Sequence, residues 1–78
     1  MKTMTCRQLG GACDKVFKAE TFDEMAELSR AHGMKMFQEG DAAHMVVIQE
    51  MIELMNHPEE MKKWLEVKRA EFDALADD

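Results

Sequence analysis

Two cysteines and two histidines are the residues of this chain whose types and spacing could do chemistry. Cys6 and Cys13 flank a Gly-Gly pair near the start of the sequence, and His32 and His44 follow later. Thiolate sulfur and imidazole nitrogen are ligands that zinc accepts readily in structural sites. Cys6, Cys13, His32 and His44 are therefore candidate metal ligands, with zinc as the ion that suits them best.

Charge and composition exclude several classes of partner. The chain of 78 residues carries 16 acidic and 10 basic side chains and a formal net charge of −6, which has the wrong sign for binding phosphates or anionic membranes. No segment reaches the roughly 18 to 20 apolar residues of a membrane span, and the first residues lack the apolar core of a signal peptide. We expect a cytoplasmic protein with neither a nucleic-acid nor a membrane partner.

The two cysteines have other possible roles in a reducing cytosol, where a permanent disulfide is uncommon. They could cycle between dithiol and disulfide, with His32 as the base that raises the thiolate fraction. They could also be two small buried groups in a plain helical oligomer or partner-binding module without site chemistry. Because no phosphate loop, nucleophile elbow or paired-carboxylate cleft is apparent, a non-enzymatic protein is favoured over an enzyme.

Residues 2–19, which contain both cysteines, are predicted to form a β-hairpin. Extended segments precede and follow Gly10-Gly11, a pair that is typical of tight turns. A turn centred on the glycines gives the register Thr5–Val16, Met4–Phe17 and Arg7–Asp14. The cysteines are then diagonal neighbours on one face, and their backbone positions are about 7 to 8 Å apart in space. That distance is long for a disulfide but suits two sulfurs that share a metal. The same register turns Gln8 and Lys15 to that face.

Three helices are expected after the hairpin, over residues 21–40, 41–56 and 58–75. Thr21 and Glu24 have the spacing of a capping box, Gly40 suits a left-handed helix end, and Asp41 can cap the next helix at once. Pro58 suits the first position of the third helix. The sequence thus predicts one small domain over residues 1–78 with an α+β, helix-dominated fold: an N-terminal β-hairpin packed on a helix, followed by two further helices.

The predicted elements can bring the histidines to the cysteines. A helix rises about 1.5 Å per residue and a strand about 3.3 Å, so a first helix running back along the second strand brings His32 level with Asp14 and Lys15. Residue 15 faces Cys6 in the predicted register. His44, near the start of the second helix, comes level with Met36 and within reach of the same place.

The second helix is apolar around more than one face. Such a helix either lies centrally in the monomer or meets another subunit, since a surface helix has one apolar stripe. We expect a homo-oligomer, most simply a dimer, with the contact formed by Val46, Val47, Met51 and Met55.

The opening KTMTCRQLGGACD, followed by a strand, Glu-Thr, an acidic helix start and a helical Ala-His, resembles a short prokaryotic family known as domain of unknown function 1059. The resemblance covers roughly residues 2–40 and implies the hairpin-and-helix arrangement but no activity. Cys6, Cys13 and His32 match the family's cysteines and first histidine. Its second histidine, five residues later, is replaced here by Phe37, and His44 would take the place of that ligand.

Overall fold

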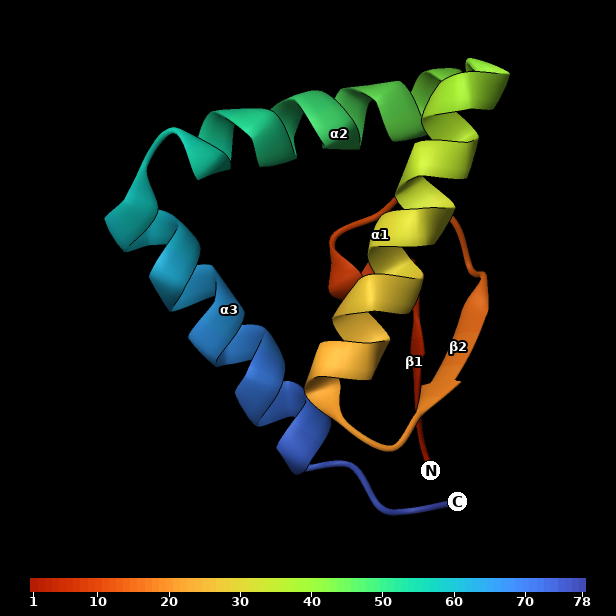
Figure 1. Cartoon of the computed structure of the whole chain (residues 1–78), viewed down its shortest axis with the longest axis vertical. Helices are drawn as coiled ribbons and strands as arrows, with labels where there is room; N and C mark the ends of the chain where they lie inside the picture. Colours follow the sequence, from red (N-terminus) through yellow and green to blue (C-terminus); the bar gives the residue numbers. More distant parts are fainter.

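A computed structural model describes residues 1–78 and has the predicted α+β architecture, with helix dominant (Figure 1). An antiparallel pair of strands precedes three helices. The elements are β1 (Lys2–Thr5), β2 (Val16–Ala19), α1 (Phe22–Glu39), α2 (Ala42–Met55) and α3 (Pro58–Asp73). Each helix lies within the range expected for it from the sequence. None of the helices combines the length and the apolar character that a membrane span requires.

The strand register is the predicted one, but the turn is not. Met4 pairs with Phe17 and Thr5 with Val16, and an ion pair 3.0 Å long joins Arg7 to Asp14. The expected tight Gly-Gly turn is wrong, because the strands are joined by the longer segment 6–15.

This connecting segment begins with a 3₁₀ helix over Arg7–Leu9, and Gly10 then takes a left-handed conformation at φ 91°. A ladder continued to the glycines would have turned Gln8 towards the core. The helical turn instead buries Leu9 and leaves Gln8 in solvent, where its side chain accepts a hydrogen bond from the Thr5 backbone N–H. The 3₁₀ turn replaces the tight turn because it buries the apolar Leu9 side chain and exposes the polar Gln8 side chain.

The core lies between the hairpin and α1 and is closed at one end by α3. Its members are Met4, Cys6, Leu9, Phe17, Ala19, Phe22, Met25 and Phe72. Phe22 of α1 and Phe72 of α3 meet edge to face with ring centroids 6.0 Å apart. Only nine of the 78 residues are buried, so this core is thin, and small domains of this kind commonly need reinforcement from a metal, a disulfide or self-association.

The helix ends follow the local chemistry that the sequence indicated. The Thr21 hydroxyl accepts the Glu24 backbone N–H at 3.2 Å, Gly40 is left-handed at φ 71°, and the Asp41 side chain caps α2. The short joint at residues 40–41 sets α2 at a sharp angle to α1, and α3 then returns towards the start of α1, so that the helices outline a triangle (Figure 1).

Helix α2 does not lie centrally in the monomer. A central position was the first of the two explanations for its apolar character, and it is wrong. Its one buried residue is His44. Val46 is 59% exposed and Met55 62% exposed, whereas Val47 and Met51 are half-buried. The sharp joint is the physical reason, because it swings most of α2 away from the hairpin core.

Candidate metal centre

Four residues from separate parts of the fold converge on one place. Cys6 directly follows β1, Cys13 lies in the loop before β2, His32 is in the middle of α1, and His44 is in the first turn of α2. One ligand atom of each lies within 4.8 Å of those of the other three. We call these four residues the Cys/His cluster. Every residue that the sequence marked as a candidate ligand belongs to it.

The His32 side of the cluster is held by packing. Its Nε2 lies 3.3 Å from the Cys13 sulfur. The buried ring of Phe17 on β2 contacts the His32 ring edge to face, with centroids 5.6 Å apart. The hairpin and α1 therefore fix this imidazole between an aromatic ring and a thiol.

The His44 side is held by hydrogen bonds. Its Nε2 lies 3.7 Å from the Cys6 sulfur, and its Nδ1 lies 2.5 Å from a carboxylate oxygen of Asp41. The His44 side chain is 5% exposed. The rings of His32 and His44 stand nearly perpendicular, at 82° with centroids 5.2 Å apart. Each ring places its Nε2 near one of the two sulfurs.

The loop conformation places both sulfurs. The Cys6 N–H donates to the Lys15 carbonyl at 2.8 Å, and the Cys6 carbonyl accepts the Gly11 N–H at 2.8 Å. The Arg7 N–H donates to the carbonyl of Cys13 at 2.9 Å. Gly11 comes so close to Cys6 that a Cβ there would collide with the Cys6 sulfur and lie 3.0 Å from its carbonyl oxygen.

The two thiols have different electrostatic surroundings. Burial is the main reason that the pKa of Cys6 is raised. Desolvation alone would also raise the pKa of Cys13, but hydrogen bonds from the Lys15 backbone and the His44 ring stabilise its thiolate, so the net shift is downward. Cys13 is thus the more readily ionised of the two.

The two imidazoles are shifted in opposite directions. The pKa of His44 is raised, chiefly by its hydrogen bond to Asp41. The pKa of His32 is lowered, first by burial and then by the charge of the nearby His44. Opposite shifts favour a neutral His32 beside a more basic His44.

The cluster has dimensions compatible with a tetrahedral metal site. Zn–S bonds of about 2.3 Å and Zn–N bonds of about 2.0 Å imply ligand-to-ligand distances of roughly 3.3 to 3.8 Å around a tetrahedron. The Cys13–His32 and Cys6–His44 sulfur–nitrogen distances, 3.3 and 3.7 Å, lie in this range. A shift of about an ångström or less brings the widest pair, at most 4.8 Å, into it as well.

Phe37 and His57 lie outside the cluster. Phe37, near the end of α1, is 50% exposed. His57 precedes α3, is exposed, and lies 3.9 Å from Glu53.

Sequence reasoning missed two residues that shape the cluster. It assigned Gly11 to a tight turn and Asp41 only to a helix cap, whereas Gly11 makes room for the Cys6 sulfur and Asp41 contacts the His44 ring. The spacing Asp41-x-x-His44 at a helix start could have indicated the second role, because residues three apart share a helix face. No local sequence pattern indicated the role of Gly11.

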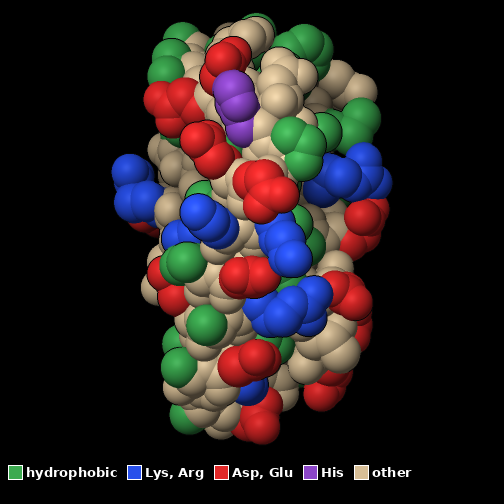
Figure 2. All heavy atoms as spheres, turned by 90° about the vertical axis from the view of Figure 1, so that its left-hand side faces the viewer, with side chains coloured by type: hydrophobic (Ala, Val, Ile, Leu, Met, Phe, Trp, Pro, Cys, Tyr) green, Lys and Arg blue, Asp and Glu red, His purple; other side chains and the backbone are tan.

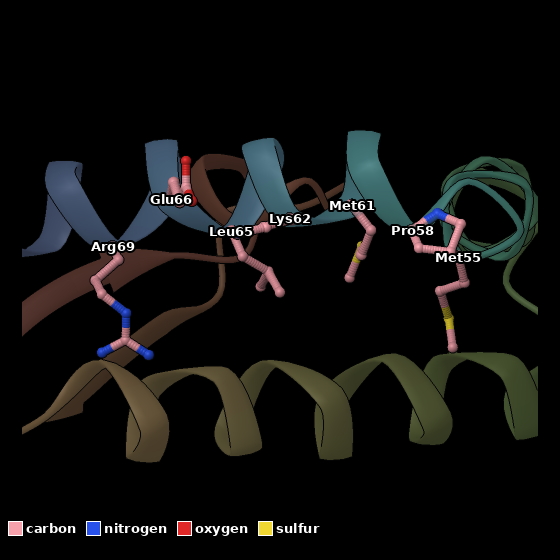
Figure 3. A pocket seen from close by; sticks show the side chains of 7 residues that line it. All are labelled: Met55, Pro58, Met61, Lys62, Leu65, Glu66 and Arg69. Carbon is pink, nitrogen blue, oxygen red and sulfur yellow. The ribbon is translucent and has the colours of Figure 1, made fainter.

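A second surface feature is an open groove beside α3, and no residue of the Cys/His cluster lines it (Figure 3). Its lining residues are Met55, Pro58, Met61, Lys62, Leu65, Glu66 and Arg69. Met55, Met61 and Leu65 point towards the side on which α1 lies. We call it the α2–α3 groove.

Comparison with known proteins gives no match: no family model, curated protein or solved structure is significantly similar to this chain. The resemblance to domain of unknown function 1059 stays a prediction, and the chemistry of the cluster rests on its geometry.

Proposed function

We propose that this chain is a small non-enzymatic metal-binding protein in which zinc fastens the hairpin loop to the middle of α1 and to the start of α2. The ligands are Cys6 and Cys13 through sulfur and His32 and His44 through Nε2. One observation supports the proposal above all: the four ligand atoms lie within 4.8 Å of one another although they come from four places in the chain.

The donor set explains why zinc is the proposed ion and why no catalytic role is proposed. Two sulfurs and two imidazole nitrogens suit zinc better than calcium or magnesium, which prefer oxygen. Four protein ligands complete a tetrahedron and leave no open position for substrate, as in structural zinc sites. Because the core is thin, the free energy of metal binding would add directly to the stability of the fold.

Metal binding by the purified chain is the direct test. We expect one zinc or cobalt ion per chain, and the cobalt form should absorb in the visible region as a tetrahedral site with two thiolates does. Replacing both cysteines by serine should abolish binding, whereas His57→Ala, at the histidine outside the cluster, should leave it unchanged. Metal well below one equivalent with both thiols freely titratable would contradict the proposal.

Removal of the metal should destabilise the native chain. If free zinc is 100-fold above its Kd, bound metal contributes about 2.7 kcal/mol. For a domain of this size, that is roughly 10 to 20 °C in melting temperature. A chelator should produce this decrease in the native protein and none in the Cys6→Ser, Cys13→Ser double variant, as followed by thermal circular dichroism.

A second candidate function is thiol-disulfide exchange. One observation favours it: the two free thiols differ, with the more exposed Cys13 having a lowered pKa and the buried Cys6 a raised one. Such a difference suits an attacking and a resolving thiol. This function requires that mild oxidation of metal-free protein link Cys6 to Cys13 within one chain, which mass spectrometry detects as the loss of two hydrogens.

A further inference from the structure

The carboxylate of Asp41 makes two contacts with the same ligand residue. Its Oδ2 accepts the backbone N–H of His44 at 3.0 Å and lies 2.5 Å from Nδ1 of the His44 ring. The first contact caps α2. The second reaches the ring nitrogen that faces away from Cys6. Asp41 is itself partly exposed, with 44% of its side chain accessible, whereas the ring that it holds is buried.

A neutral imidazole offers one lone pair, and the proton on the other nitrogen decides where that lone pair is. A carboxylate at Nδ1 keeps the proton there, so the lone pair of His44 is at Nε2, the nitrogen that lies 3.7 Å from the Cys6 sulfur. The same negative charge makes Nε2 a stronger donor to a cation. His32 has no side-chain partner at its Nδ1 and is oriented by the Phe17 ring instead.

We propose that Asp41 is a positioning residue of the metal centre, which selects the Nδ1–H form of His44 and presents its Nε2 to the metal. This inference rests on the proposed function. It also assigns the start of α2 to the site, because one carboxylate both starts the helix and orients the ligand in its first turn. When the first turn of α2 forms, the same carboxylate therefore also orients the His44 ring for the metal.

The two roles of Asp41 can be separated by substitution. Asp41→Ser keeps a side chain that caps helices well but is too short to reach the ring. Asp41→Asn keeps the cap and an oxygen that can accept the Nδ1 proton, and it removes only the charge. Thr21→Ala is the matched control, because Thr21 caps α1 in the same way and contacts no ligand.

Metal affinity is measured by competition with a chromophoric chelator, together with helix content by circular dichroism. We expect Asp41→Ser to bind zinc about 10- to 100-fold more weakly than the native chain, as for other partners of ligand histidines, with helix content retained. Asp41→Asn should show a smaller loss. Thr21→Ala should lower the melting temperature and leave the affinity unchanged.

Nuclear magnetic resonance of the ring nitrogens provides a readout that a purely structural role would not change. In metal-free protein, at a pH where both imidazoles are neutral, His44 should carry its proton on Nδ1. In Asp41→Ser it should shift towards the Nε2–H form that predominates for histidine in water, while His32 stays as it was.

The outcomes separate this inference from the proposed function. If the native chain binds no metal, the proposed function fails and the inference fails with it. If the native chain binds metal and Asp41→Ser binds equally well with an unchanged tautomer, the inference is overturned and the proposed function stands. If Asp41→Ser loses helix content, Asp41→Asn decides on the charge: native affinity in that variant overturns the claim that the negative charge of Asp41 makes Nε2 a stronger donor.

Discussion

At the scale of single residues, the absence of a side chain at Gly11 makes room for the sulfur of Cys6. The Cys6 sulfur occupies the space that a Cβ at position 11 would need. Because the two residues can approach closely, the loop folds back over Cys6, and the Cys6 carbonyl accepts the Gly11 N–H. Gly33 contrasts with it, because a Cβ there would meet nothing within 4 Å.

Gly11→Ala should therefore displace the Cys6 sulfur. We expect a loss of stability of about 1 to 3 kcal/mol, as is typical of overpacking, together with weaker metal binding. The matched variant Gly33→Ala, inside α1, should gain about 0.5 to 1 kcal/mol, because alanine favours helix over glycine. Urea denaturation of the metal-free variants measures the change in stability, and competition with a chelator measures the change in metal affinity. A Gly11→Ala chain as stable as the native one would refute the role of this contact.

At the scale of elements, the geometry of α1 decides which histidines can meet. Residue 37 follows His32 by five positions, which is about 140° around a helix and 7.5 Å along it. Phe37 accordingly lies outside the cluster and is half-exposed, and α2 supplies the second imidazole from His44. Two helices joined at a sharp angle thus contribute one imidazole each.

A histidine at position 37 should not substitute for His44. We expect Phe37→His to leave zinc affinity within about twofold of the native value, since its ring would start from the wrong side of the helix. His44→Ala should weaken zinc binding strongly, and the double variant with Phe37→His should bind no better than His44→Ala alone. Recovery of affinity in the double variant would show that α1 can hold two ligands.

At the scale of the whole molecule, α2 and α3 leave apolar side chains uncovered. Met55 and Leu65 of the α2–α3 groove are 62% and 38% exposed, and Val46 on α2 is 59% exposed. Figure 2 shows the side of the molecule that lies on the left in Figure 1. On this face acidic and basic side chains are interspersed, with apolar groups between them. Exposed apolar groups of this kind favour association.

We expect a dimer whose contact includes Val46 and Met55, with Val47 and Met51 contributing less because they are half-buried within the chain. The double variant Val46→Lys, Met55→Lys should be monomeric by light scattering at tens of micromolar, an order of magnitude that populates dimers of moderate affinity. Val67→Lys is the control, because Val67 is 55% exposed but lies on α3 and is not part of the expected contact. A native chain that is monomeric at this concentration would exclude the dimer.

The sequence by itself determined the helix ends, the strand register and the four candidate ligands. Thr21, Gly40, Asp41 and Pro58 act on backbone groups within about four residues, so their roles follow from local chemistry. The register follows from side chains that alternate between the two faces of a strand, with Met4 opposite Phe17 on the inner face. These features need no knowledge of the rest of the molecule.

Only the tertiary structure decided how these parts meet. The 3₁₀ turn forms because Leu9 has a core to enter, and Gly11 is required because the Cys6 sulfur lies against it. The sharp angle between α1 and α2 turns His44 into the cluster and leaves Val46 and Met55 in solvent. These outcomes depend on contacts between residues far apart in the chain, whose packing together sets each helix direction. Local patterns allowed His44 to reach the cysteines but did not determine the angle between α1 and α2.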